Sequence, residues 1–322
     1  MMLDTPIAFI IFNRPQHTRQ SFAVIREQRP SKLLIIADGA RAGHPTDAAR
    51  CRETREIVAH IDWPCEVLRN YAEANMGCKR RVSSGLDWVF EQVEKAIVIE
   101  DDCLPNQDFF SFCDTLLTRY EADSRVWVIT GNNFQNGKKR GDAAYYFSKF
   151  NHCWGWATWR RAWQHYRVDI PFWPGWKDTV DWVKKLPDPV ERKIWSGLLD
   201  RVQRGEIDTW DYQWTATVWY HGGLTATPQV NLVTNIGFGP EATHTVTADD
   251  QAGLPVLPLG PLTHPTVVKQ NLVADRHVLN QNFGGSSHPD RFNNQLRRRK
   301  EQLFRSPQWA LKKLKQAFGS RG

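Results

Sequence analysis

The chain of 322 residues has no hydrophobic run that approaches the roughly 20 residues needed to cross a bilayer. Its first apolar stretch, residues 7–12, follows an acid and ends in Asn-Arg-Pro, which predicts a strand and not a signal peptide. The six cysteines form no CxxC pair and no paired spacing with histidine. This pattern excludes a zinc finger or a disulfide framework and makes a reducing cytoplasm the expected compartment.

The positive charge of the chain is confined to its end. Of the 42 Lys/Arg and 35 Asp/Glu, residues 297–322 hold nine bases and one acid, which leaves 33 bases and 34 acids for residues 1–296. The body is therefore close to neutral although the whole chain carries a net charge of +7. A basic groove for nucleic acid is not expected, because no positive surface is available in the body to attract phosphates.

Residues 1–130 alternate short apolar runs with amphipathic stretches. The runs predict strands at 7–12, 33–38, 65–70, 96–100 and 125–130, and the stretches between them predict helices at 14–28, 46–61, 79–93 and 107–120. Continuous apolar strands separated by helices indicate an α/β fold with a mostly parallel sheet covered on both faces. In such sheets ligands bind outside the carboxyl ends of the strands.

Polar residues follow the strands at these carboxyl ends. Asn13-Arg14 follows the first strand, Asp38-Gly39 the second, and Glu100-Asp101-Asp102 the fourth. Each group alone is an ordinary strand end or turn, but together they would line one crevice. Three adjacent carboxylates repel one another, and a hard divalent cation such as Mg²⁺ or Mn²⁺ would relieve that repulsion.

Tryptophan is concentrated in the second half of the chain. Eleven of the fifteen Trp residues lie between positions 154 and 219. Most are expected to build a core, although flat aromatic faces also bind sugars, so one or two of them could line an acceptor site. Residues 246–292 are rich in Pro, Gly, Asn and His and are expected to be an irregular extension.

Six motifs in this order resemble the GT-A glycosyltransferases, especially N-acetylglucosaminyltransferase I and its bacterial relatives. They are FIIFNRP, LLIIADG, NMGCKRRVSSGLDWVF, AIVIEDDCLPNQDFFSF, FNHCWGWATWRRAW and TWDYQW. The resemblance covers residues 5–245. It implies a GT-A domain over 1–245, with a nucleotide-binding half at 1–130 and an acceptor-binding half at 131–245.

The resemblance also implies a role for each acid of the cluster. Asp102 would ligate Mn²⁺ or Mg²⁺, Asp101 would bind the ribose, and Glu100 would lie near the donor sugar. The remaining residues placed around the nucleotide and the diphosphate are Asn13, Arg14, Asp38 (which would accept the uracil N–H), Asn75, Gly77, Lys79 and Arg80. The residues placed on the acceptor side are Trp154, Gly155, Trp156 and Trp210. For Lys79, Arg80 and Arg81 a solvated helix face is an equal alternative.

Asp211 is the candidate catalytic base, because an inverting transferase has to remove a proton from the attacking hydroxyl. Asp208, three residues earlier, could share a helical face with it and is the fallback; both could instead cap the helix that follows. A late histidine, His244, would bind metal or diphosphate, or be an ordinary loop residue. His152 is expected to be structural.

The implied function is transfer of a sugar, such as GlcNAc, from a UDP-sugar to a saccharide, glycolipid or glycoconjugate hydroxyl in bacterial surface polysaccharide synthesis. Two alternatives remain open: an inactive carbohydrate-binding protein on the same fold, and a sugar nucleotidyltransferase, although residues 10–18 have no glycine for a triphosphate loop. The basic tail, residues 293–322, has amphipathic spacing typical of a helix on an anionic membrane, so a peripheral place on the inner face is an expectation alongside a terminal helix that docks on the domain.

Overall fold

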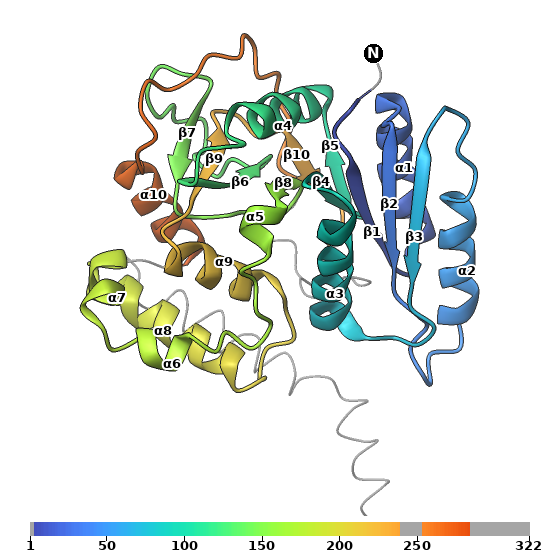
Figure 1. Ribbon diagram of the computed structural model, residues 1–322, viewed down its shortest axis with the longest axis horizontal. Coiled ribbons are helices and arrows are strands. Elements are labelled where there is room, and N and C mark those ends of the chain that lie inside the picture. Colours follow the sequence, from blue (N-terminus) through green and yellow to red (C-terminus); the bar gives the residue numbers. More distant parts are fainter. Residues whose placement is uncertain (1–2, 239–252, 284–322) are drawn as a thin grey trace, which may run out of the picture.

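The computed structural model describes residues 3–238 and 253–283, and its centre is a sheet of eight strands (Figure 1). These strands are β1 (Ile7–Ile11), β2 (Lys32–Ala37), β3 (Glu66–Tyr71), β4 (Lys95–Glu100), β6 (Val126–Thr130), β7 (Tyr145–Ser148), β8 (Trp156–Trp159) and β9 (Leu224–Pro228). They lie in the order β3-β2-β1-β4-β8-β6-β9-β7. Only β8 and β7 run against the rest, so the sheet is mostly parallel.

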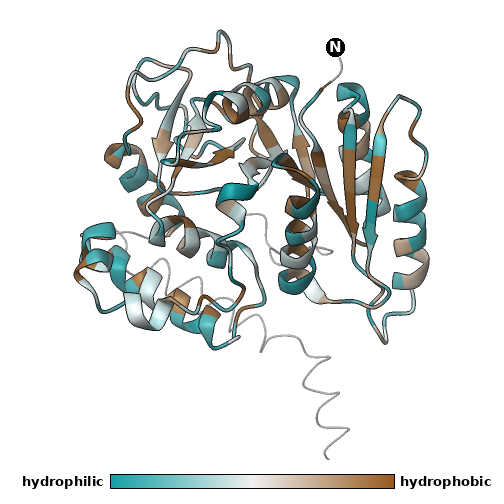
Figure 2. Cartoon of the chain, in the orientation of Figure 1, coloured by the Kyte–Doolittle hydropathy of each residue, from teal (hydrophilic) through white to brown (hydrophobic). Residues whose placement is uncertain are grey.

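Helices cover both faces of this sheet, which explains why its strands are apolar on both sides. Along β1, Ile7, Phe9 and Ile11 pack into one core and Ala8 and Ile10 into the other. The first core is closed by α1 (Pro15–Gln28) and α4 (Gln107–Arg119), with α2 (Asp47–Ile57) beside α1. The second is closed by α3 (Gly77–Gln92), α5 (Arg160–Trp163), α6 (Trp173–Trp176), α7 (Val180–Lys185), α8 (Pro189–Gln203) and α9 (Asp211–Tyr220). Figure 2 shows the strands as a hydrophobic centre between helices with hydrophilic outer faces.

The predicted α/β architecture is confirmed, and the predicted elements of residues 1–130 are found with boundaries that shift by a few residues. The proline at position 15 begins α1, where its missing N–H costs nothing. One pairing was not predicted: β5 (Cys103–Pro105) pairs antiparallel with β10 (Val233–Asn235). This two-stranded sheet brings the segment after β10 back to the end of β4.

The tryptophan-rich segment is core, as predicted for most of its members. Ten of the eleven Trp between 154 and 219 have 6% or less of their surface exposed, and Trp154 is the exception. They pack ring against ring across α5, α6, α8 and α9; Trp163, for example, lies 5.0 Å from Trp214 between ring centroids. Burying so many large rings gives this half of the domain a rigid frame.

The expectation of an irregular extension is wrong for part of residues 246–292. Residues 272–282 form α10 (Leu272–Asn282). Asp275 of α10 is buried and accepts a hydrogen bond from Ser148 at 2.6 Å, and Gln270 bridges to Phe147 at the edge of the sheet. This segment is therefore part of the domain.

The basic tail, residues 293–322, lies outside the described residues. Within 3–238 and 253–283, no helix is both long enough and apolar enough to cross a membrane.

Candidate active site

A cavity of about 530 Å³ opens at the carboxyl ends of the parallel strands β1, β2 and β4. In Figure 1 the ends of β1, β2 and β3 lie beside the start of α3. The opposite wall comes from residues 207–212, which lead into α9, and from residues 235–238 after β10. The crevice predicted from the three strand ends therefore exists, and the segment after β10 closes it.

The three adjacent acids line this cavity with different surroundings. Asp101 is buried, its Oδ2 accepts the backbone N–H of Phe12 at 3.3 Å, and its Oδ1 pairs with the guanidinium of Arg14. Asp102 is partly exposed, and its Oδ2 accepts Nη1 of Arg14 at 2.9 Å. Glu100 ends β4 and faces the cavity. One arginine thus holds two acids, while the third has no such partner among the printed ion pairs of the described residues.

Burial and mutual repulsion perturb these acids. Burial, followed by the charge of Asp102, raises the pKa of Glu100 to about 8. Burial also raises the pKa of Asp101, against the opposing effect of Arg14. Carboxyl groups with raised pKa values in a cleft are typical of functional sites, because their charge is kept at a cost in free energy.

A thiol shows how closely the two walls approach each other. Cys78 lies at the start of α3, and burial together with the charges of Glu100, Asp211, Asp208 and Asp102 raises its pKa. Two of these acids follow β4 and two precede or begin α9, positions more than 100 residues apart in the sequence. The fold therefore gathers the four carboxylates around one point, as the sequence analysis predicted for the acid cluster and Asp211.

Asp38 organises the loop that precedes α3. Its Oδ1 accepts the N–H groups of Gly39 (2.8 Å) and Met76 (2.9 Å), and its Oδ2 accepts Nδ2 of Asn75 (2.9 Å) and the N–H of Gly77 (3.2 Å). A carboxylate has about four acceptor positions, so these donors occupy them all. A nucleobase N–H would have to displace one of them to bind Asp38.

Asp211 is the first residue of α9 and lines the cavity. Its Oδ1 accepts a hydrogen bond from Thr209, and its place at the helix N-terminus also favours a negative charge. The N-cap is Trp210, without a side-chain bond, so the alternative that these acids cap the helix is not supported. Asp208 lines the cavity from the loop before α9, so the expectation that it shares a helical face with Asp211 is wrong.

The predicted acceptor residues divide into two groups. Trp154 and Trp210 line the cavity, and the ring of Trp154 meets that of Phe238 edge to face at 5.5 Å. Trp156 is 1% exposed and stacks under Trp210 at 5.6 Å, so it supports the wall from behind. Gly155 has φ +69°, and a Cβ there would lie 2.8 Å from a methyl carbon of Val233. Its role is to let β8 approach β10.

Several predicted residues do not line the cavity. Asn13 donates to Asp47 at 2.8 Å behind the wall, and Lys79 and Arg80 lie on α3 outside the cavity lining. Arg81, for which a solvated helix face was one reading, is buried and donates to the carbonyl oxygens of Ala37 and Asn70, which ties α3 to the ends of β2 and β3. His244 lies outside the described residues.

Sequence reasoning missed the residues that reach the site from the far side of the sheet. Gly237 packs so closely on Asp102 that a Cβ would lie 2.1 Å from its Oδ2. The N–H of Ile236 donates to the carbonyl oxygen of Asp102 at 2.8 Å, which fixes that contact. The Gly-rich stretch at 236–239 was the available signal, but only the pairing of β5 with β10 connects it to the acids.

The donor set fits a hard divalent cation. The titratable groups that line the cavity are carboxylates, arginines, thiols and a tyrosine, with no imidazole among the described lining residues. No three His, Cys, Asp or Glu side chains within 3–238 and 253–283 converge into a ready-made metal site. Such a cavity suits Mg²⁺ or Mn²⁺, which bind one or two carboxylates and complete their shell with water and phosphate oxygens.

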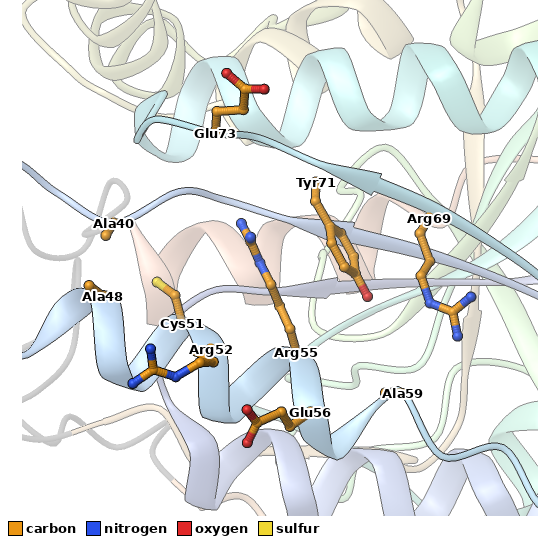
Figure 3. A pocket seen from close by; sticks show the side chains of 10 residues that line it. All are labelled: Ala40, Ala48, Cys51, Arg52, Arg55, Glu56, Ala59, Arg69, Tyr71 and Glu73. Carbon is orange, nitrogen blue, oxygen red and sulfur yellow. The ribbon is translucent and has the colours of Figure 1, made fainter.

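A second hollow of about 490 Å³ lies between α2 and the edge strand β3 (Figure 3). Arg55 crosses it, stacks on Tyr71 at 4.9 Å, and donates from Nη2 to the carbonyl oxygens of Asp38 (3.0 Å) and Ala72 (2.9 Å). These bonds hold the ends of β2 and β3 together. We interpret this hollow as the outer surface of a brace for the Asp38 loop.

Comparisons with known proteins show no family. No family model matches the chain, and no curated protein matches it. Three solved structures are similar in part. The 4-diphosphocytidyl-2C-methyl-D-erythritol synthase of Anaerococcus prevotii is 8% identical (TM-score 0.34, covering 69% of this chain and 88% of that one). Mouse xyloside xylosyltransferase 1 is 10% identical (TM-score 0.34, 69% and 84%), and a UDP-glucose pyrophosphorylase with UDP-glucose is 10% identical (TM-score 0.26, 51% and 78%). At these TM-scores the function has to be argued from the site itself.

Proposed function

We propose that the chain is a metal-dependent, inverting glycosyltransferase that moves a sugar from a UDP-sugar to a hydroxyl of a saccharide or glycoconjugate. One observation carries the proposal: the charge of the cavity. Its lining includes six acids, Asp38, Glu100, Asp101, Asp102, Asp208 and Asp211, against three arginines, Arg14, Arg41 and Arg81. A surplus of acids at the carboxyl ends of parallel strands supports a ligand that arrives with a cation.

The charge balance also favours a particular kind of ligand. A bare diphosphate would be repelled by this wall, since like charges a few ångströms apart cost several kcal/mol when solvent is scarce. A divalent cation held by Asp102 removes that repulsion and, when bound, stabilises the departing diphosphate as a Lewis acid. Asp101 is then placed for the ribose hydroxyls and Glu100 for the donor sugar.

Asp211 is the proposed base. It faces the acids from the opposite wall, and inversion requires the acceptor hydroxyl to attack from the side opposite the leaving group. Thr209 and the N-terminus of α9 hold its carboxylate in place and favour its charged form. Trp154 and Trp210, beside Asp211, offer aromatic surface to the acceptor sugar.

Calorimetry with UDP, with and without Mn²⁺, tests the proposal. We expect UDP to bind only with Mn²⁺, and Asp102→Asn to lose this binding. Asp62→Asn is the matched control, because Asp62 is a half-exposed acid in an Arg pair far from the cavity. Unchanged Mn²⁺-dependent binding in Asp102→Asn would refute the metal role.

Turnover tests the base. With the UDP-sugar that gives the largest thermal shift, Asp211→Asn should bind the donor normally but release UDP about 10²–10⁴-fold more slowly, the usual contribution of a general base. Normal turnover would move the role to Asp208. Binding without any transfer by the unmodified chain would favour a carbohydrate-binding protein, and release of diphosphate from UTP plus a sugar phosphate would favour a nucleotidyltransferase.

A further inference from the structure

Arg14 bonds both acids of the cluster with one guanidinium. Nη1 lies 2.9 Å from Oδ2 of Asp102, and Nη2 pairs with Oδ1 of Asp101. The side chains of Arg14 and Asp102 are only 14% and 15% exposed, and that of Asp101 3%. Charge-assisted bonds of this kind, shielded from water, are among the stronger hydrogen bonds in proteins.

The other two arginines of the cavity are committed elsewhere. Arg41 pairs with Asp47 at 2.6 Å, and Arg81 donates to the carbonyl oxygens of Ala37 and Asn70. Among the lining residues that the structure describes, Arg14 is therefore the cation that neutralises the acid cluster.

This arrangement conflicts with a cation at Asp102. Oδ2 is the oxygen that Arg14 holds, and the same oxygen lies against Gly237. Oδ1 faces Sγ of Cys103 at 3.6 Å. A divalent cation on this carboxylate would lie within a few ångströms of the guanidinium, where the repulsion between the two positive charges is large. The two cations cannot both be bound to Asp102 in this geometry.

We propose that Arg14 is an exchangeable counter-ion. Without ligand it neutralises Asp101 and Asp102. When Asp102 binds the divalent cation it gives up its bond to Nη1, and the freed N–H groups of Arg14 turn to the diphosphate while Nη2 stays on Asp101. Arg14 thus opposes metal binding in the empty site and supports nucleotide binding in the loaded one. The inference rests on the proposed function, which supplies the cation and the diphosphate.

The exchange predicts opposite signs for two affinities of one variant. In Arg14→Met, Mn²⁺ alone should bind about 10–100-fold more tightly, because a charge-assisted bond no longer competes for Asp102. UDP in saturating Mn²⁺ should bind weaker by a similar factor, because the diphosphate loses its arginine. A residue that only maintained the fold would weaken both affinities.

Electron paramagnetic resonance of free Mn²⁺ measures the first affinity and calorimetry the second. Arg26→Met is the matched control: Arg26 lies on the same helix and pairs with Asp62 through two nitrogens, but in solvent, and both affinities should stay unchanged. Arg14→Lys keeps the charge but cannot bridge two carboxylates, so its Mn²⁺ affinity should lie between those of the natural chain and Arg14→Met. It also serves if the methionine variant does not fold.

The outcomes separate this inference from the proposed function. If the unmodified chain does not bind UDP with Mn²⁺, the proposed function and this inference both fail. If it does, and Arg14→Met binds Mn²⁺ alone equally or more weakly, the competition is refuted while the proposed function stands. If Arg14→Met binds both Mn²⁺ and Mn²⁺-UDP more tightly, Arg14 competes but does not transfer to the diphosphate, and the exchange is refuted.

Discussion

Gly237→Ala should damage the site without a change in any polar side chain. A Cβ on Gly237 would lie 2.1 Å from Oδ2 of Asp102 and 2.8 Å from its Cβ and Cγ. Real Cβ contacts essentially never fall below 3.0 Å, so the carboxylate has to move by roughly 1 Å. The backbone holds Asp102 from the other side, because its carbonyl oxygen accepts the N–H of Ile236. The strain therefore falls on the carboxylate.

The cost follows from the metal–oxygen distance. Mg²⁺ and Mn²⁺ need oxygen ligands at about 2.1 Å, and a shift of one carboxylate to about 3.1 Å weakens the attraction of one unit-charge pair by roughly 2–3 kcal/mol at an effective dielectric constant of about 20. We expect Mn²⁺-dependent UDP affinity to fall about 30–150-fold. The unfolding free energy should change by only about 1 kcal/mol, because the clash lies at the cavity edge.

Calorimetry measures this affinity, and urea unfolding measures stability. Gly175→Ala is the control, because a Cβ there has open space and the backbone needs no special conformation. An unchanged affinity in Gly237→Ala would show either that Asp102 does not hold the cation or that the segment after β10 can move away, and would refute the reasoning.

Three other predictions concern stability and surface binding. Lys149→Met should lower the free energy of unfolding by about 3–5 kcal/mol, because it leaves the buried carboxylate of Glu191 unpaired; a loss no larger than that of the exposed Lys184→Met would contradict this. Burial lowers the pKa of His152 to about 3 from 6.5, so below pH 6.5 the unfolded chain takes up a proton that the folded chain does not. Stability should therefore fall with pH by up to about 1.4 kcal/mol per unit, and His152→Leu should reduce that slope in urea titrations at pH 7 and 5. Removal of residues 295–322 should abolish co-sedimentation with anionic vesicles at low salt; equal sedimentation of both chains would exclude the tail as a membrane anchor.

The nucleotide-binding half was largely readable from the sequence because its elements are formed by local patterns. Continuous apolar runs such as residues 33–37 can only be strands covered on both faces, and α1 begins at its proline as expected. The polar residues at the strand ends follow from this, since parallel strands place their carboxyl ends along one edge.

The other wall of the site was less readable. A motif placed Asp211 in the site, but the start of α9 at this residue removed the helical face expected for Asp208. Gly237 gave no signal, because its importance lies in a contact with Asp102, 135 residues away in the chain. Arg81 looked like a surface residue of a basic helix and is buried against two carbonyl oxygens.

The sequence by itself determined the α/β class, the order of the first strands and helices, and the place of the acids at a strand end. These depend on periodicity and on residues close together in the chain. Only the tertiary structure decided which acids have a partner. Arg14 neutralises Asp101 and Asp102, whereas Glu100 and Asp211 face each other across the cavity. Such pairing depends on how strands, loops and the returning segment after β10 are packed, and burial then sets the cost of each charge.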